Sequence, residues 1–231
     1  MNTDIIKRAW VLAVAIILLT ACGIPSNDNK TKMEEFPILA WYSLLGDEVN
    51  KERYLEMREA GFNISFSHFK TSEEVERALH ESNGTGVKIL MTCKELEQEP
   101  EKTVLHFKDH PNLLGYFLMD EPTSREFPEL ADWAERIKSV DSSNILYLNL
   151  FPSYVSLSHL GVNTYLEYVE RFIREVKLGL VSFDHYPICF EGVRPEYYAN
   201  LEDIAKAADI SRSEAGRCFQ AYMGCSPVDM L

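Results

Sequence analysis

The segment LLGYFLMDEP, residues 113–122, is the stretch that decides the fold. Its first seven residues are apolar or glycine, and a short run of this kind between turn signals is typical of a β-strand. The run ends in two carboxylates, Asp120 and Glu121, followed by Pro122. The segment therefore predicts a strand that carries acidic side chains to its carboxyl end.

Similar apolar runs lie on both sides of this segment and alternate with stretches of helical period. This alternation predicts βα units around a parallel sheet. Ser72 is expected to cap the second helix, and Trp133 to lie on the buried face of the fourth. Strands are expected at 38–45, 64–69, 87–93, 113–122, 145–152 and 180–188, and helices at 50–62, 72–82, 95–111, 128–140 and 164–178.

The predicted fold class is α/β, an incomplete TIM-type (β/α) barrel with about six βα units over residues 36–199. No antiparallel hairpin is evident, and no glycine-rich loop follows the first strand, which disfavours a dinucleotide-binding fold. A complete barrel of this kind takes about 250 residues. Because only about 40 residues follow the sixth expected strand, strands seven and eight are expected to be missing.

Aromatic and polar side chains gather at the expected strand ends, where barrels of this type carry their active sites. Aromatic rings can cover the apolar face of a sugar, while carboxylates and amides bind its hydroxyls. Two other interpretations stay open, because the aromatics could fill the barrel and the histidines could be hydrogen-bonded core residues. The candidate substrate-binding residues are Trp41, Tyr42, His68, Asp120, Asn149, Asp184, His185 and Tyr186.

Glu121 is the candidate catalytic residue. Cleavage of a glycosidic bond needs a carboxylic acid that protonates the leaving oxygen, and a second carboxylate. Regular strand alternation would point Asp120 and Glu121 to opposite sides of the sheet, so we expect that they do not form this pair. The alternative interpretation is that the two carboxylates and Pro122 only begin the next helix.

The strand end GYFLMDEP resembles the clan A glycoside hydrolases. The order of elements and the later FDHYP are also similar to those of secreted barrel lipoproteins of glycan-degrading bacteria. The resemblance covers residues 36–199 and implies a (β/α)8 barrel in which Glu121 is the general acid/base. Asp120 stands where asparagine is common in that clan, so the usual contact to a sugar 2-hydroxyl is not carried over. The clan's nucleophile is a glutamate at the end of the seventh strand, and it is expected to have no counterpart in this chain.

The N-terminus predicts export to the cell envelope. Lys7 and Arg8 precede an apolar run over residues 9–19, which is short for a membrane span and typical of a signal peptide. Residues 19–22, LTAC, resemble the lipobox of bacterial lipoproteins, which implies a signal peptide at 1–22, acylation of Cys22 and a flexible tether at 23–35. The expected location is the outer membrane or the cell surface. The alternative interpretation of the N-terminal segment is a short anchor helix with an incidental cysteine.

The remaining cysteines, at positions 93, 189, 218 and 225, show no metal-binding spacing and no disulfide pattern. Cys93 is expected to be a small core residue. We therefore expect no metal and no cofactor.

The C-terminal segment, residues 200–231, has the spacing of a helix-turn-helix with Ser211 as the cap of the second helix. It resembles the first helix-turn-helix of AraC/XylS-type regulators through Ala205, Ile210, Ser211, Arg217, Phe219, Gly224, Ser226 and Pro227. That resemblance implies DNA contacts from Ser211, Arg212, Ser213 and Arg217. The chain's net charge of −13 disfavours DNA binding.

Three functional hypotheses follow. The first is a membrane-anchored glycoside hydrolase-like protein that acts on or binds a glycan and is catalytically incomplete. The second is a DNA-binding transcriptional regulator that acts in the cytoplasm through its tail. The third is a non-hydrolytic glycan-binding lipoprotein. A gene fusion near Leu201 would explain why a barrel and a regulator segment occur in one chain.

Overall fold

The computed structural model describes residues 36–184, 188–189, 192–193 and 207. The predicted signal peptide and tether, with Cys22, lie outside the described residues. So do His185, Tyr186 and, apart from Ala207, the predicted helix-turn-helix with Ser211, Arg212, Ser213 and Arg217. In the described part of the chain, no helix is both long and apolar enough to cross a membrane.

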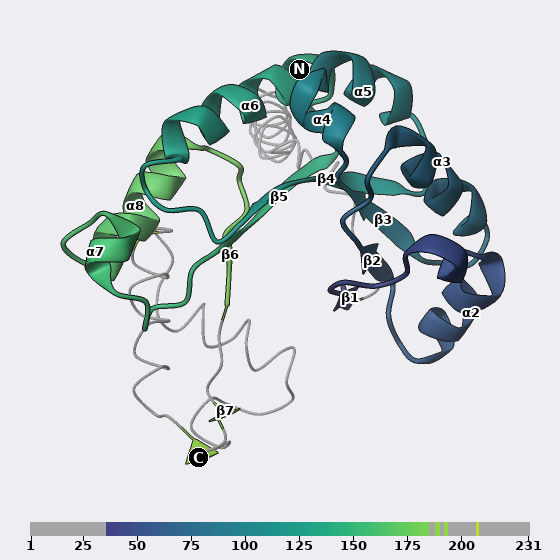
Figure 1. The fold of residues 1–231 in the computed structure, drawn as a ribbon, viewed down its shortest axis with the longest axis horizontal. Helices are drawn as coiled ribbons and strands as arrows, with labels where there is room; N and C mark the ends of the chain where they lie inside the picture. The colour runs from purple at the N-terminus through teal and green to yellow at the C-terminus, as the bar shows by residue number, and fades with distance from the viewer. Residues whose placement is uncertain (1–35, 185–187, 190–191, 194–206, 208–231) are drawn as a thin grey trace, which may run out of the picture. The chain divides into compact units, whose positions relative to one another are not determined.

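A six-stranded parallel sheet forms the centre of the described fold (Figure 1). The strands pair in sequence order, and all five pairings are parallel. They are β1 (Leu39–Ala40), β2 (Ile64–Phe66), β3 (Lys88–Met91), β4 (Leu113–Asp120), β5 (Ile145–Leu150) and β6 (Ser182–Phe183). This order is that of a (β/α) barrel, so the predicted fold of about six TIM-type units is confirmed.

Helices connect the strands and follow the outer side of the curved sheet (Figure 1). They are η1 (Gly46–Glu48), α2 (Lys51–Glu59), α3 (Ser72–Glu81), α4 (Lys94–Gln98), α5 (Pro100–Phe107), α6 (Phe127–Val140), α7 (Leu157–Leu160) and α8 (Tyr165–Glu175). Because each crossover returns the chain to the same end of the sheet, the carboxyl ends of all six strands lie at one edge.

Several expected boundaries are wrong for local reasons. The first strand has two residues instead of 38–45, because Tyr42 takes a φ of 52°, outside the extended region. The sixth strand likewise covers only 182–183 instead of 180–188. Thr71, not Ser72, caps α3, since its side chain accepts a hydrogen bond from the Glu74 N–H at 3.4 Å.

The expected helix at 95–111 is divided into α4 and α5. Glu99 has φ −133° and ψ 58°, because the residue before a proline is disfavoured in the helical region. A short antiparallel pair, β7 (Ile188–Cys189) with β8 (Gly192–Val193), also differs from the expectation that no hairpin is present.

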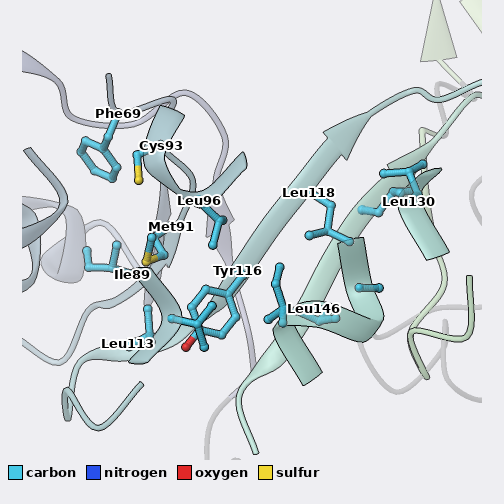
Figure 2. Close-up of a cluster of buried hydrophobic side chains, with 14 of the residues drawn as sticks. Phe69, Ile89, Met91, Cys93, Leu96, Leu113, Tyr116, Leu118, Leu130 and Leu146 are labelled. Carbon is cyan, nitrogen blue, oxygen red and sulfur yellow. The ribbon is translucent and has the colours of Figure 1, made fainter. Parts of the chain in front are cut away.

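Two apolar clusters lie on the two faces of the sheet, since alternate residues of β4 and β5 belong to different clusters. The larger cluster fills the space between the sheet and the helices, and Figure 2 shows part of it, including Ile89, Met91, Tyr116, Leu118, Leu130 and Leu146. The smaller cluster consists of Ile64, Phe66, Leu90 and Phe117, with Leu39, Trp41, Leu114 and Tyr147 packed against it.

Two predicted core residues belong to the larger cluster. Cys93 is a buried free thiol, as expected. Trp133 is only partly buried, and its indole N–H donates to the Leu96 carbonyl oxygen at 3.0 Å. The Trp133 side chain therefore ties α6 to α4.

Strand β4 contains an irregularity that decides where its acidic end points. Phe117 pairs with Tyr147, and Asp120 pairs with Asn149, so three steps along β4 match two along β5. An extra residue of this kind is a β-bulge, which shifts the side chains that follow it to the other face. Asp120 therefore faces the same side as Phe117, Tyr147 and Asn149.

The start of β5 is held by the carboxylate of Asp141, which is buried. It accepts hydrogen bonds from the Tyr116 hydroxyl at 2.7 Å and from the backbone N–H groups of Ser143 and Asn144. Burial opposes ionisation of this group, but the hydrogen bonds from Asn144, Tyr116 and Ser143 outweigh it and hold the pKa of Asp141 well below its ordinary value. The register of β5 against β4 is thereby anchored at its first residues.

Gly115 of β4 lies close to the backbone of β5. A Cβ atom added at this position would lie 2.0 Å from the carbonyl oxygen of Ile145. That atom belongs to the backbone, so the overlap can be relieved only by separating the two strands.

Gly115→Ala is therefore expected to lower the free energy of unfolding by about 3 kcal/mol or more, the upper part of the range for overpacked sites. Urea unfolding followed by circular dichroism measures this loss. The control is Gly61→Ala, where nothing lies within 4 Å of an added Cβ and only the positive φ is unfavourable, by roughly 1–2 kcal/mol. Equal losses in the two variants would contradict the close approach of β4 and β5.

Candidate functional site

A cavity of about 400 Å³ lies at the carboxyl ends of β4, β5 and β6. We call it the strand-end cavity. It brings together five of the predicted site residues from four different strand ends, in the position that the barrel fold predicts for an active site. Its lining residues are Trp41, Asp120, Glu121, Tyr147, Asn149, Ser182, Phe183 and Asp184.

Hydrogen bonds connect the polar residues of the cavity across three strands. The side-chain amide of Asn149 donates to Asp120 Oδ1 at 3.2 Å and to Asp184 Oδ1 at 2.9 Å. Its oxygen accepts from Ser182 Oγ at 3.0 Å. Ser182 Oγ is also 2.6 Å from the Tyr147 hydroxyl. Asn149 is buried, so these contacts fix its side chain in one orientation.

The structure corrects the expectation that Asp120 and Glu121 point to opposite sides of the sheet. The bulge in β4 turns Asp120 toward Asn149. Glu121 then leaves the strand with a φ of 49°, and its backbone N–H donates to the Asn149 carbonyl oxygen at 2.8 Å. Both carboxylates therefore line the same cavity.

A positive φ is uncommon for a residue with a side chain, and strained backbone of this kind is frequent at functional sites. In the described chain, the non-glycine residues with positive φ are Tyr42, Glu121 and Lys177. Two of these three follow the ends of β1 and β4, which are strand ends that we predicted to carry the site.

Glu121 and Asp184 line the same cavity, and their carboxyl groups interact. Burial, then the contact with Asp184 and its negative charge, and then the charge of Asp120 raise the pKa of Glu121 to about 7. A substantial fraction of Glu121 therefore carries its proton near pH 7. A carboxylic acid with this property is suited to donate a proton to a leaving group.

Aromatic rings extend from the cavity across the ends of β1 and β2. The Trp41 ring packs against Phe66, with 4.7 Å between the ring centroids, while it also lines the cavity. Tyr42 is 60% exposed, and its ring lies 5.1 Å from that of His68. Tyr42 and His68, both predicted to bind substrate, thus lie beside the cavity and not among the residues that line it.

Sequence reasoning did not select Tyr147, Ser182 and Phe183 as site residues. Tyr147 could have been found, because it lies two residues before Asn149 in one strand and so faces the same side. Ser182 could have been found in the same way, because it lies two residues before Asp184 in the expected sixth strand. Phe183 carried no such signal.

A larger cavity, of about 560 Å³, lies on the helix side of the sheet, between α3 and α5. Most of its charged groups are exposed. Lys102 pairs with Glu99 at 2.7 Å, and His106 pairs with Glu76 of α3 at 3.2 Å. We favour the strand-end cavity as the functional site because its carboxylates lie beside one another without a cation among the described lining residues. No group of His, Cys, Asp or Glu suited to a metal ion is present in the described part of the chain.

No protein-family model and no curated protein sequence matches the chain. Among solved structures, it is similar to a proposed α-L-fucosidase from Bacteroides thetaiotaomicron, with a TM-score of 0.50 and 11% identity over 78% of this chain and 70% of that one. At this identity the likeness shows the fold alone, which is that of a (β/α) barrel.

Two further solved structures are more distant. An endo-1,4-β-mannanase from Eisenia fetida has a TM-score of 0.43 and 11% identity, over 58% of this chain and 59% of that one. A glycoside hydrolase family 5 protein from Bacteroides vulgatus has a TM-score of 0.41 and 14% identity, over 75% of this chain and 55% of that one. The chain thus spans less than two thirds of the length of these two proteins.

The raised pKa of Glu121 predicts a stability effect that depends on pH. The folded state binds this proton more tightly than the unfolded state, so the penalty for ionising Glu121 grows as the pH rises from about 4.5 to about 7. Glu121→Gln cannot ionise and removes the penalty. In urea titrations, the free energy of unfolding of this variant minus that of the wild type should be larger at pH 8 than at pH 4.5.

The matched control is Glu129→Gln, which removes the same charge from an exposed position of α6, outside the strand-end cavity. It should give no comparable gain with pH. A constant difference between Glu121→Gln and the wild type across this pH range would show that Glu121 is not buried against Asp184.

Proposed function

We propose that this chain binds a glycan in the strand-end cavity and that Glu121 protonates a glycosidic oxygen. The observation that carries the proposal is the pairing of the Glu121 and Asp184 carboxyls in a cavity that is also lined by the Trp41 ring. A proton donor beside an aromatic ring matches the needs of sugar recognition and of leaving-group protonation. The glycoside hydrolase-type barrel supports the same reading.

The proposed step needs only the carboxyl groups and one water molecule, and no cofactor. The Glu121 carboxyl gives its proton to the bridging oxygen as the bond from that oxygen to the anomeric carbon breaks, and the bonding electrons stay with the oxygen. Water supplies a hydroxyl group to the anomeric carbon. The remaining proton of that water returns to the carboxyl pair.

A second candidate function, glycan binding without hydrolysis, is favoured by one specific observation. The paired carboxyls of retaining glycosidases are about 5–5.5 Å apart, and those of inverting enzymes about 6.5–9.5 Å. The carboxyl of Asp184 instead interacts directly with that of Glu121. Asp184 is therefore not placed to act as the second carboxylate across the bond that Glu121 protonates.

The test combines binding and hydrolysis with the full-length chain. Oligosaccharides are screened by isothermal titration calorimetry, and those that bind are incubated and analysed for released sugars. Glu121→Gln is expected to keep its affinity but to lose hydrolysis by about 10²–10⁴-fold, the usual contribution of a general acid. Trp41→Ala is expected to weaken binding because it removes the ring that lines the cavity.

The control is Trp133→Phe, an aromatic change on the helix side of the sheet, which should leave both measurements unchanged. Binding that is lost in Trp41→Ala but is never followed by hydrolysis would favour the second candidate. Equal binding by the wild type and Trp41→Ala would contradict both candidates, because both place the glycan against the Trp41 ring in the strand-end cavity.

We also propose that Cys22 is acylated and anchors the chain at the cell envelope. The support for this proposal is the sequence LTAC at 19–22 after a basic and apolar segment. Each buried methylene of an acyl chain adds about 0.8 kcal/mol of membrane affinity, so acylation would hold the protein at the membrane surface.

The full-length chain expressed in a bacterial host is expected to enter the detergent phase on Triton X-114 partitioning. Cys22→Ala should move it to the aqueous phase, since no acyl chain can be attached. Cys93→Ala is the matched control, because it removes a buried thiol and leaves the lipobox intact. Equal partitioning of Cys22→Ala and the wild type would exclude acylation of Cys22 as the anchor.

A further inference from the structure

We propose that Glu121 and Asp184 form a carboxyl pair that shares one proton, and that the side chain of Asn149 assigns this proton to Glu121. Asp184 is then a positioning residue, because it acts through Glu121. The use of the proton rests on the proposed function. The pair itself rests on contacts within the strand-end cavity.

Backbone hydrogen bonds hold the two carboxyl-bearing residues on opposite sides of one strand. The Glu121 N–H donates to the carbonyl oxygen of Asn149 at 2.8 Å, and the Asp184 N–H donates to that of Leu150 at 3.2 Å. These two carbonyls are consecutive in β5. Glu121 and Asp184 are therefore held at neighbouring positions by the backbone of β5.

The direction of each hydrogen bond in the network follows from the number of available hydrogens. Ser182 donates its only hydroxyl hydrogen to Asn149 Oδ1. The Tyr147 hydroxyl must then be the donor in its 2.6 Å contact with Ser182 Oγ. Because Asn149 Oδ1 is the acceptor in this chain, the amide nitrogen of Asn149 faces the carboxylates.

That amide nitrogen has two hydrogens, and both are used. One is donated to Asp184 and the other to Asp120. A hydrogen bond donated to a carboxylate favours its ionised form. No amide hydrogen of Asn149 is left for Glu121, so the shared proton belongs to Glu121.

The groups around Glu121 also favour a proton on its carboxyl. Asp120 from β4 and Asp184 from β6 bring negative charge, while the hydroxyls of Tyr147 from β5 and Tyr168 from α8 are neutral. Tyr168 donates its hydrogen to the Pro122 carbonyl oxygen and is not available to a carboxylate. Among the described residues that line the cavity, none is Lys or Arg.

The experiment measures the titration of the Glu121 carboxyl directly. The full-length chain is labelled with glutamate enriched in carbon-13 at its side-chain carboxyl, and the Glu121 signal is identified by its loss in Glu121→Gln. In the wild type the pKa of Glu121 is expected near 7. In Asp184→Asn it should fall toward the ordinary value of 4.5, because a like charge is removed and the new amide can donate to Glu121.

Asp120→Asn is the matched control, since it removes the same charge from the same cavity but from a residue that contacts Asn149 instead of Glu121. It should lower the pKa of Glu121 by less than Asp184→Asn does. Ser182→Ala, which frees the amide of Asn149 to turn, should also lower it. This third variant keeps the test valid if Asp184→Asn does not fold.

A wild-type pKa of Glu121 near 4.5, or equal effects of Asp184→Asn and Asp120→Asn, would overturn the proposal. So would an unchanged pKa in Ser182→Ala. The titration needs no substrate, so its result is independent of the hydrolysis assay. An intact pair without glycan binding would refute the proposed function alone, and glycan binding without the pair would refute this inference alone.

Discussion

The β-bulge in β4 is the feature on which the rest of the site depends. Because three residues of β4 match two of β5, Asp120 turns to the face that carries Tyr147 and Asn149. The positive φ of Glu121 then brings the next carboxyl into the same cavity. A regular strand would have placed only one of these two carboxyls there.

Electrostatics in the cavity follow from this geometry. Three carboxyls lie together, and one amide can satisfy only two of them. The third keeps its proton, since partial burial and two neighbouring negative charges oppose its ionisation. The structure thus produces a proton donor near neutral pH from common residues and without a metal ion or a cofactor in the proposed step. The hydroxyl chain from Tyr147 through Ser182 keeps the amide oriented.

The sequence predicted the fold class and most strand positions, because buried strands of a parallel sheet read as apolar runs between helical segments. It also predicted five residues of the cavity, since strand ends of a barrel meet at one edge. It did not predict that Asp120 and Glu121 share a face, because a bulge depends on pairing between strands and leaves no periodic pattern. The contact between Glu121 and Asp184 was also not predicted, because the two residues are far apart in the chain and meet only through the pairing of strands.

The most direct test of this account is a crystal structure of Glu121→Gln with a bound oligosaccharide. The account predicts a sugar ring over Trp41 and a glycosidic oxygen within about 3 Å of the side chain at position 121, the reach required of a general acid. It also predicts Asp120 and position 121 on one face of β4. A glycan bound away from the strand-end cavity, or a regular β4 that points these two side chains to opposite faces, would contradict it.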